Sequence, residues 1–333
     1  MVDTTLPPVT GQAPSGSSVP SPKAAGRRHV GLPWRVRLRR DRSLIVMTLP
    51  ALILLVVFSY IPMVGLITAF QDYNVYSGFL HSPWVGISQF TELFGDPAFW
   101  QAFVNTIGIF AVQLILFFPC PIIFALVLDS LLSRRLKSLL QSVTALPHFF
   151  SWVLVVTLFE QMLGGAGLVP TFLRHHGISN PWNVMTDPGT FKLLASAQLI
   201  WKETGWSAII YMAALAGINP ELYEACAVDG GGRWRRVRHV SLPGLKPIAI
   251  LLLILNLGYA LSFGFEQMLL QLGAVGPGAA QVLSVYSYEY GIVQGQYSFG
   301  AAAGLFLGVA SAILLLAANK VAHMFGEDGL YRR

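Results

Sequence analysis

Charged residues are scarce in this chain of 333 residues, and their scarcity excludes an ordinary soluble domain. Only 11% of the residues are charged, whereas soluble domains carry about a quarter. Hydrophobic residues make up 54% of the chain, and the mean hydropathy is +0.59. This composition predicts a membrane protein with several spans. The formal net charge of +6 then reflects lysine and arginine placed around the spans, and we expect no nucleic-acid partner.

The chain also lacks the common catalytic and nucleotide-binding signatures. It contains no GxxxxGK[ST] phosphate loop, no HExxH, no paired CxxC and no GxSxG. Its two cysteines, Cys120 and Cys226, lie in an apolar run and in a polar loop, and we interpret both as small fillers rather than a disulfide. The pair His175-His176 has no third ligand beside it. The sequence therefore predicts no catalytic residue, no metal site, no cofactor and no ATP hydrolysis by this chain alone.

Six apolar stretches are each long enough to cross a bilayer core of ~30 Å, which takes about 20 helical residues. Pro119 and Pro121 predict a kink in the second stretch. The four-residue spacing of Gly300, Gly304 and Gly308 in the last stretch predicts that another helix packs closely there. The sequence thus predicts an all-α membrane protein with six transmembrane helices, near residues 44–70, 101–128, 138–160, 192–217, 247–270 and 298–319.

The chain before the first span is polar. Residues 1–26 are rich in Pro, Ser, Gly and Thr without periodicity, and residues 27–42 are strongly basic. This pattern predicts that residues 1–43 form a disordered cytoplasmic arm whose basic part contacts membrane lipid. Residues 44–97 then hold the first helix and an outer loop, and residues 321–333 form a cytoplasmic tail.

Lysine and arginine alternate from one connection to the next. The arm before the first span, the connection after the second span and the loop after the fourth span are basic, whereas residues 71–100 and 271–297 contain no lysine or arginine. Because positive residues stay inside, we expect a multi-pass protein of the cell membrane with both termini in the cytoplasm. The basic loop after the fourth span then lies on the side where ATP is found.

That basic loop, NPELYEACAVDGGGRWRRVRHVSLP at residues 219–243, is the longest polar interruption in the second half of the chain. Asn219 is a favourable N-cap, and Pro220 suits the first helical position. The glycine run that starts at Gly230 can adopt left-handed angles and stop the helix. A second short helix, rich in arginine, follows. The loop is therefore expected to form two short helices joined by a hinge.

This loop resembles the EAA loop of binding-protein-dependent ABC importer permeases. In that family Glu-Ala-Ala is followed after three residues by Gly, after nine more by Ile and after one more by Leu-Pro. The chain keeps every spacing, with Cys226 in place of Ala and Val240 in place of Ile. The resemblance implies a coupling helix that docks on a separate ATPase subunit. It assigns this role to Glu224, Ala225, Cys226, Asp229, Gly230, Val240, Leu242 and Pro243.

Other segments are similar to the carbohydrate branch of these permeases, especially its polysaccharide or oligosaccharide type. They are residues 201–232, the GFEQ at 264–267 and the ANKVAHMFGEDGLY at 318–331. The resemblance implies a permease core of five helices at residues 98–320, with the first span as an added helix. It also implies partners: a second permease subunit, ATP-binding ABC subunits that hold the nucleotide, and an extracytoplasmic solute-binding protein.

Polar and ionisable residues interrupt the spans. A charge at membrane depth costs at least ~2.5 kcal/mol, so it needs a partner or a water-filled path. One interpretation is a polar lining of a translocation pathway, with Trp206 as a stacking surface for a sugar ring. The other is an ion pair of Lys202 with Glu160 or Glu266 that fixes helix register. The pathway candidates are Glu160, Lys202, Glu203, Trp206, Glu266 and Gln267.

The resemblance therefore implies the transmembrane permease subunit of an ATP-driven importer for a sugar or oligosaccharide, and no enzyme. Two alternatives stay open: a permease of the same kind for a non-sugar solute, and a membrane-embedded transferase that acts on lipid-linked sugars. A transferase needs catalytic carboxylates or histidines clustered at one membrane surface, whereas the outer loops here contain only scattered acidic residues.

Overall fold

A computed structural model describes residues 42–178 and 183–324. These residues form helices and connecting turns, with one isolated bridge between Gln71 and Trp84, so the all-α prediction is confirmed for them. Residues 1–41 of the predicted arm and 325–333 of the predicted tail lie outside the described residues, whereas residues 321–324 continue the last helix, Tyr297–Met324. The chain divides after Tyr60 into two units.

The first unit contains the start of the first apolar stretch. Helix α2 (Arg42–Leu55) has Pro50 inside it and is followed by a π-helical turn, η1 (Val56–Tyr60). Neither element buries a residue, and their large apolar side chains are exposed. This is the surface that a helix surrounded by lipid presents.

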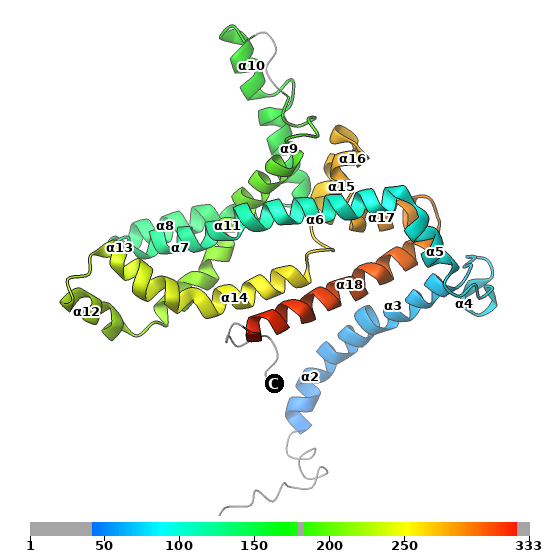
Figure 1. Cartoon of the computed structure of the whole chain (residues 1–333), viewed down its shortest axis with the longest axis horizontal. Coiled ribbons are helices and arrows are strands. Elements are labelled where there is room, and N and C mark those ends of the chain that lie inside the picture. The colour runs from blue at the N-terminus through cyan, green and yellow to red at the C-terminus, as the bar shows by residue number, and fades with distance from the viewer. Residues whose placement is uncertain (1–41, 179–182, 325–333) are drawn as a thin grey trace, which may run out of the picture. The chain divides into compact units, whose positions relative to one another are not determined.

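The second unit contains the remaining helices, which are labelled in Figure 1. In chain order they are α3 (Ile61–Val64), η2 (Gly65–Phe70), α4 (Gly78–His81), α5 (Ser88–Gly95), α6 (Pro97–Phe117), α7 (Pro119–Asp129), α8 (Arg134–Ala145), η3 (Leu146–Phe149), α9 (Trp152–Leu163), α10 (Leu168–His175), α11 (Phe191–Ala216), α12 (Pro220–Val228), α13 (Arg233–Arg236), η4 (Val237–Ser241), α14 (Leu242–Gly258), α15 (Phe265–Val275), α16 (Pro277–Ala280), α17 (Leu283–Tyr288), η5 (Glu289–Val293) and α18 (Tyr297–Met324).

Several helical stretches are suited to a bilayer, as the composition predicts. Helix α11 has 26 residues, but its lysines, glutamine and glutamate lower its hydropathy. The described residues contain five helical stretches that are long and apolar enough to cross a membrane: Arg42–Phe70, Pro97–Asp129, Trp152–His175, Arg233–Gly258 and Tyr297–Met324.

The helices differ from the six predicted spans in two places, and the third span is the first of them. The prediction of one helix over residues 138–160 is wrong, because α8, η3 and α9 replace it. Pro147 has no N–H to donate to the preceding turn. The Ser151 hydroxyl then starts a new helix by accepting a hydrogen bond from the N–H of Leu154.

The prediction of one helix over residues 247–270 is also wrong. Helix α14 ends at Gly258, turns occupy residues 259–264, and α15 starts at Phe265. Gly264 has a φ of +69°, a left-handed conformation that glycine adopts without a steric penalty. By contrast, the disturbance predicted at Pro119 in the second span is confirmed, because α6 ends two residues before this proline.

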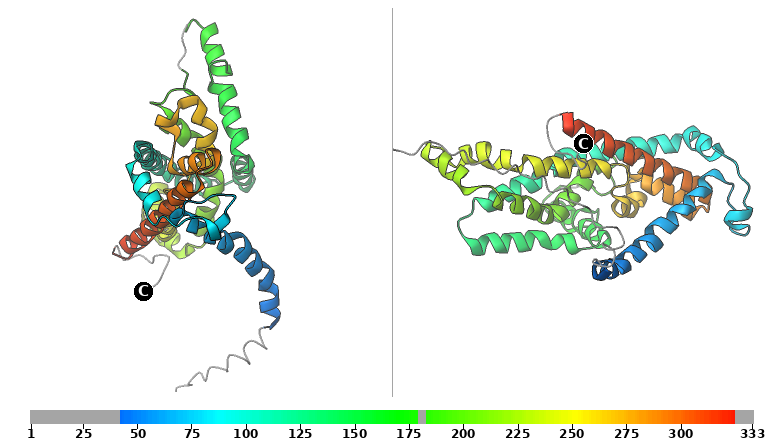
Figure 2. Two further views of the ribbon diagram at one scale, coloured as in Figure 1. Left: turned by 90° about the vertical axis from the view of Figure 1, so that its right-hand side faces the viewer. Right: turned by 90° about the horizontal axis from the view of Figure 1, so that it is seen from below.

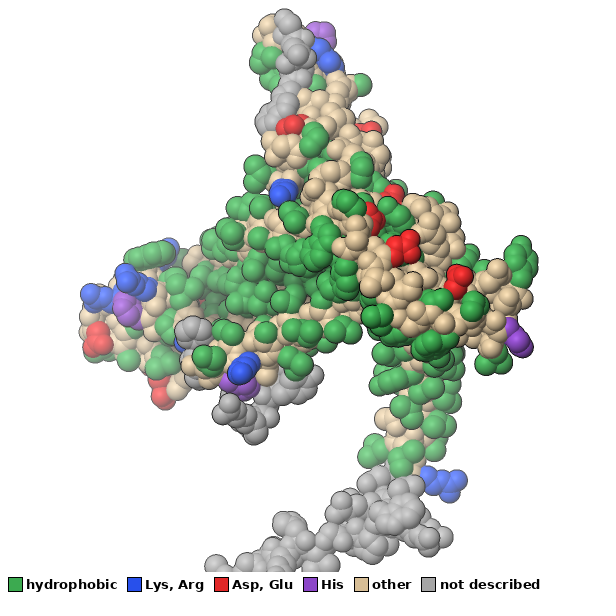
Figure 3. All heavy atoms as spheres, turned by 45° about the vertical axis from the view of Figure 1, so that its right-hand side comes forward, with side chains coloured by type: hydrophobic (Ala, Val, Ile, Leu, Met, Phe, Trp, Pro, Cys, Tyr) green, Lys and Arg blue, Asp and Glu red, His purple; other side chains and the backbone are tan. Residues whose placement is uncertain are grey.

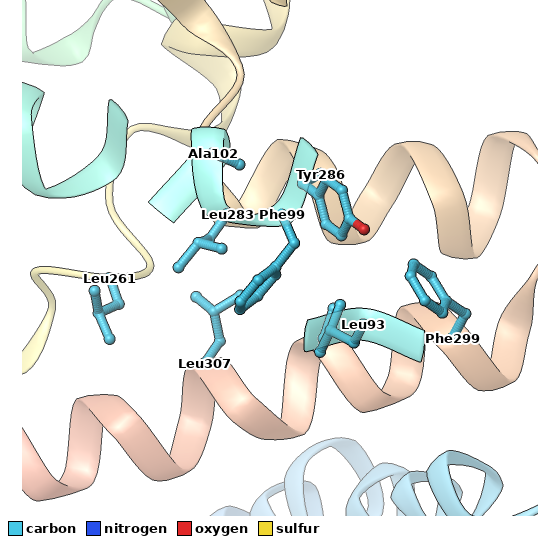
Figure 4. Packing of buried hydrophobic residues seen from close by; sticks show 9 residues of the cluster. Leu93, Phe99, Ala102, Leu261, Leu283, Tyr286, Phe299 and Leu307 are labelled. Atoms are coloured by element: carbon cyan, nitrogen blue, oxygen red, sulfur yellow. The ribbon is translucent and has the colours of Figure 1, made fainter. Parts of the chain in front are cut away.

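A buried apolar cluster joins α5, α6, α17 and α18 (Figure 4). Phe99 is fully buried there, and its ring meets those of Tyr286 and Phe306 edge to face. The Tyr286 hydroxyl donates a hydrogen bond of 2.5 Å to one oxygen of Asp96, whose other oxygen caps α6 by accepting from the N–H of Ala98. Burial and then this hydrogen bond to Asp96 raise the pKa of Tyr286, so the phenol stays a neutral donor.

A second apolar cluster joins α7, α11 and α14. Helix α18 lies beside α14 (red and yellow in Figures 1 and 2), and Gly258 of α14 leaves no room for a side chain next to Leu315. Because α11 and α14 pack together, they hold both ends of the chain segment that contains α12. The members of this cluster are Ala125, Ala208, Tyr211, Leu215 and Leu245.

The predicted small-residue stripe of α18 is confirmed at its first position. Gly300 approaches Gly291 of η5 so closely that a Cβ on Gly300 would overlap the Gly291 Cα. At Gly304 the nearest atom to an added Cβ would be the Ser287 hydroxyl oxygen at 3.8 Å, and at Gly308 nothing lies within 4 Å. Close approach therefore depends on Gly300 and not on the whole stripe.

We expect Gly300→Ala to destabilise the second unit, because the added methyl group overlaps backbone atoms that cannot rotate away. Overpacking of this kind costs ~1–3 kcal/mol. Gly308→Ala on the same helix is the matched control, since its methyl group meets open space. The measurement is the thermal unfolding midpoint of the purified chain in detergent. Equal midpoints for the two variants would contradict the close approach.

Candidate functional site

The polar segment between α11 and α14 forms a short helix, α12, followed by a glycine turn. The side-chain oxygen of Asn219 accepts a hydrogen bond of 3.0 Å from the N–H of Glu221, and Pro220 is the first helical residue. The predicted cap is therefore confirmed. Helices α12 and α13 lie at one end of the second unit, where Lys and Arg side chains gather (Figures 1 and 3).

The turn after α12 depends on two glycines. Gly230 has a φ of +73°, in the left-handed region. The N–H of Gly231 donates a 2.8 Å hydrogen bond to the carbonyl of Cys226, and a Cβ on Gly231 would overlap the Cys226 sulfur. Gly232 has an ordinary φ of −71° and nothing within 4 Å of an added Cβ. The predicted glycine turn that stops the helix is confirmed, and its strict requirement for glycine lies at the first two positions of the run.

The second short helix does not end before the next apolar run. Helix α13 passes through the π-helical turn η4 directly into α14, which makes one helical stretch, Arg233–Gly258. The expectation of a second short helix that ends before the next span is therefore wrong, and the non-helical turn ends at Gly232. Pro243 directly follows the π-helical turn η4, in which the N–H of Leu242 donates to the carbonyl of Val237 five residues earlier. The regular hydrogen-bond pattern is therefore already interrupted where Pro243 has no N–H to donate.

The residues of the loop motif divide by exposure. Val240 is buried, and Cys226 is half-buried against the glycine turn. Helix α12 thus leaves its acidic and small residues on the surface, where another protein can reach them. The exposed motif residues are Glu224, Ala225, Asp229, Gly230, Leu242 and Pro243.

Two contacts hold the segment that contains α12 against the rest of the second unit, and the loop motif indicated neither of them. The Tyr223 hydroxyl lies 3.1 Å from the Ser241 hydroxyl in η4. At the start of α14, Gly244 leaves no room for a side chain because Ile218 lies against it. The only sequence signal for Tyr223 was its position three residues before Cys226, on the same half-buried side of the helix.

Lys202, near the middle of α11, is buried and paired. Its Nζ lies 3.2 Å from one carboxylate oxygen of Glu203 and donates a 2.6 Å hydrogen bond to the backbone carbonyl of His148 in η3. The Nδ1 of His148 lies 2.7 Å from the other oxygen of Glu203. The His148 ring stacks on Trp206 with the two planes 1° apart and the centroids 4.4 Å apart. We call these four residues the Lys202 cluster.

The Lys202 cluster replaces the ion pair expected from the sequence. The pairing of Lys202 with Glu160 or Glu266 is wrong, because both carboxylates are exposed and lie on α9 and α15 without an ion pair to it. Removing one partner of a buried pair costs about 3–5 kcal/mol, so Glu203 compensates the burial of Lys202. Since His148 covers one face of Trp206, that indole face is not open to a solute.

A cavity of about 360 Å³, here called the central cavity, lies between α6, α9, α11, α14 and α15. Glu203 and Gln267 line it, whereas the other four pathway candidates do not. Six aromatic side chains line it, together with amide, hydroxyl and carboxylate groups. Such a wall suits a solute that has both apolar faces and hydroxyl edges. The lining includes Phe110, Gln113, Phe117, Trp152, Ser207, Asn256, Tyr259 and Phe263.

Sequence reasoning did not select two residues of this region. His148 completes the Lys202 cluster, and Gln113 lines the central cavity. The Nε2 of Gln113 is buried, and it has no hydrogen-bond partner among the described residues. For both residues, the available signal was a polar residue inside an apolar stretch of the sequence.

The described residues contain neither a metal-binding cluster nor a disulfide. Within residues 42–178 and 183–324, no three His, Cys, Asp or Glu side chains come together to hold a metal ion. Cys120 and Cys226 are both free thiols.

Curated relatives resemble this chain over most of its length. The Bacillus subtilis (strain 168) polygalacturonan/rhamnogalacturonan transport system permease protein YteP is 39% identical over 297 residues, which cover 89% of this chain and 92% of that protein. The Rhizobium radiobacter lactose transport system permease protein LacF is 31% identical over 242 residues, which cover 68% of this chain and 80% of that protein.

A solved structure has the same fold. The crystal structure of a bacterial ABC transporter involved in the import of the acidic polysaccharide alginate contains a chain that is 33% identical to this one. The two superpose with a TM-score of 0.80, over 88% of this chain and 99% of that chain.

The family model for binding-protein-dependent transport system inner membrane components matches residues 117–325, a range that includes α12, the glycine turn and most of the central cavity. This agreement confirms the resemblance inferred from the loop motif. This multi-pass membrane protein therefore belongs to the family of binding-protein-dependent transport system inner membrane components.

Proposed function

We propose that this chain is the transmembrane permease subunit of an ATP-driven importer for a sugar or oligosaccharide. The observation on which this rests is α12, a capped helix that is exposed on its acidic and small residues and held between α11 and α14. The names of the relatives support the sugar, since they are permeases of polygalacturonan, rhamnogalacturonan and lactose transport. The central cavity supports it too, because its aromatic wall and amide groups suit a sugar ring.

The importer would contain more subunits than this chain. A second permease subunit would complete the pathway, and ATP-binding ABC subunits would hold the nucleotide, so the chain needs no cofactor of its own. An extracytoplasmic solute-binding protein would deliver the sugar. This last partner is supported by a neighbouring structure, that of a bacterial alginate ABC transporter in complex with an alginate pentasaccharide-bound periplasmic protein.

In the membrane, α11 would be the sixth span beside the five apolar stretches. Its 26 residues are long enough, at about 1.5 Å each, and Gln198, Lys202 and Glu203 are paired within the protein. Residues 98–320 would form the permease core, with the first span as an addition. The basic end at α12 and α13 would face the cytoplasm, as would both termini.

Single cysteines test this orientation. In a variant whose two native cysteines are alanine, cysteine at Tyr76 or Gly278 should react with an impermeant thiol reagent in intact cells. Cysteine at Leu132 or Val228 should react only after the membrane is opened. All four positions are exposed, so burial does not limit the reaction. Labelling at Val228 in intact cells would overturn the orientation.

Movement of α12 would reach the central cavity through α11 and α14. The Tyr223–Ser241 hydrogen bond and the close contact of Gly244 with Ile218 join α12 and its flanks to both helices. Ordering of the ATPase subunits by ATP would displace α12, and the pathway would change the side on which it is open.

We expect Gly230→Ala to uncouple ATP hydrolysis from uptake or to release the ATPase. A non-glycine residue in the left-handed conformation costs about 1–2 kcal/mol, and relieving that strain would turn α12 away from its partner. Gly232→Ala is the matched control, because its φ of −71° is ordinary and its surroundings are open. Binding-protein-stimulated ATPase activity of the reconstituted complex is measured together with the amount of ATPase retained.

The charge-reversing variant Glu224→Lys tests the same surface. It should leave membrane insertion intact and weaken retention of the ATPase. If Gly230→Ala and Glu224→Lys both kept normal subunit content and normal stimulated hydrolysis, α12 would not be the coupling element.

Glu203→Gln should reduce uptake at least tenfold while the ATPase stays bound, because Lys202 and His148 lose their anion beside the central cavity. Glu92→Gln, at an exposed carboxylate of α5 outside the central cavity, is the control and should transport normally. The measurement is accumulation of labelled sugar in vesicles. Loss of the Glu203→Gln chain from the membrane would indicate a role in folding instead, and unchanged uptake would exclude both roles.

A further inference from the structure

Three buried glutamines form a closed hydrogen-bonded cluster between α11 and α15. Gln198 of α11 is fully buried, and Gln267 and Gln271 of α15 are each 1% exposed. The Gln198 oxygen accepts from the Nε2 of Gln267 at 2.8 Å and from the Nε2 of Gln271 at 3.0 Å. The Nε2 of Gln198 donates to the Gln271 oxygen at 3.1 Å. We call these residues the glutamine cluster.

The backbone supplies the remaining partners of the glutamine cluster. The Nε2 of Gln267 also donates to the carbonyl of Ala195, and the Nε2 of Gln271 to the carbonyl of Gln267. An amide that is buried without partners is costly, so this mutual satisfaction explains how three glutamines are tolerated in one apolar region.

The glutamine cluster separates two cavities. Gln267 lines the central cavity. One helical turn further along α15, Gln271 lines a second cavity of about 180 Å³, whose wall also contains Glu160, Asn183 and Thr186. Gln198 bonds to both glutamines of α15 and so joins a residue in the wall of one cavity to a residue in the wall of the other. The second cavity lies toward the connection that follows α9, and the central cavity lies toward α14.

Helix α15 is also separated from its neighbours in the chain by special backbone conformations. Gly264 before it has a φ of +69°, and Gly276 after it has a φ of +84°. Both are left-handed conformations that favour glycine. A helix of 11 residues between two such turns can shift as a unit without bending the helices before and after it.

We propose that the glutamine cluster is the closed barrier between the two cavities and the element that selects hydroxylated solutes. This inference rests on the proposed function, from which it takes the solute and the orientation. A sugar that enters from the second cavity would exchange its hydroxyl groups for the amide–amide hydrogen bonds. Each broken bond is then replaced, because a hydroxyl both donates and accepts. An apolar solute of the same size would leave the three amides unsatisfied and would be rejected.

The unsatisfied amide of Gln113 indicates where such a solute would bind next. Its Nε2 is buried in the wall of the central cavity without a hydrogen-bond partner in the described part of the chain. A sugar hydroxyl that has passed the glutamine cluster would accept from this group. The barrier and the first binding group beyond it are thus both glutamine amides.

The test uses the reconstituted complex with cysteine at Ser207, in the wall of the central cavity, and with both native cysteines replaced by alanine. An impermeant maleimide added from the outside should label this cysteine slowly at rest. Gln198→Ala should raise the labelling rate at least tenfold, because it removes the amide that joins both sides of the barrier. Gln161→Ala, an exposed glutamine on α9, is the control and should leave the slow rate unchanged. Equal rates for Gln198→Ala and Gln161→Ala would overturn the proposal.

If Gln198→Ala does not assemble, a cross-linking variant tests whether the glutamine cluster is a barrier. The double variant Gln198→Cys/Gln271→Cys is joined by a short bifunctional thiol reagent whose bridge can be reduced. Cross-linking should lower uptake at least tenfold, and reduction should restore it, whereas the two single variants should not respond. Normal uptake by the cross-linked complex would show that uptake does not require α11 and α15 to separate, which excludes a barrier here.

The same measurements distinguish failure of the proposal from failure of the proposed function. If the wild-type complex accumulates no sugar, the proposed function is wrong. The labelling of Ser207→Cys still reports whether the glutamine cluster closes the central cavity, because it requires no solute.

Discussion

An ammonium group in the middle of a membrane helix needs both a counter-charge and hydrogen-bond acceptors, and the arrangement of the second unit follows from how Lys202 obtains them. The counter-charge comes from the next residue, Glu203, and an acceptor comes from the carbonyl of His148. That carbonyl is available because the chain leaves the helical pattern at η3. In an unbroken helix it would accept from the N–H four residues later. The interruption at Pro147 therefore supplies a hydrogen-bond acceptor for Lys202 and also brings the His148 ring to Glu203.

The same constraint explains why α11 differs from the other long helices. Its polar side chains bond to other parts of the protein, Lys202 to η3 and Gln198 to α15. Hydrogen bonds between membrane helices are worth about 0.6–2 kcal/mol each, so several together fix the positions of the neighbours firmly. Helix α11 packs against α6, α7, α8 and α14 and is shielded by them. Helix α11 is not among the five helical stretches that are apolar enough to cross a membrane by hydropathy. The polar residues that lower its hydropathy are the ones that join it to its neighbours.

Features encoded within a few residues were predictable from the sequence. The cap at Asn219 and the left-handed turn at Gly230 were both correctly predicted, because each depends on its immediate neighbours. The interruptions at Ser151 and Gly264 also had local signals, a capping hydroxyl and a glycine. The two interruptions lie within or beside apolar runs that are long enough to span a bilayer. The span prediction followed the length of these runs and not the local signals.

Pairings between distant residues were not predictable in this way. His148 and Glu203 are separated by 55 residues, and Gln198 and Gln271 by 73. Composition indicated that Lys202 needs a partner but could not identify it, because the choice depends on how α8 and η3 lie against α11. The candidate ATPase-docking surface was therefore largely visible in the sequence, whereas the polar contacts around the central cavity required the structure.

The helical stretch Arg233–Gly258 has a mechanical consequence. Its 26 residues, at 1.5 Å each, make a rod about 39 Å long. The rod begins directly after the glycine turn that follows α12, and the residue after its end, Tyr259, lines the central cavity. Both ends of the rod meet turns, whereas the rod itself contains the π-helical turn η4 and Pro247, which interrupt its regular hydrogen bonds. In the proposed importer, a displacement at the basic end would reach the cavity along this rod. Bending at η4 or Pro247 would reduce the part of that displacement that arrives at residues 259–264 and α15.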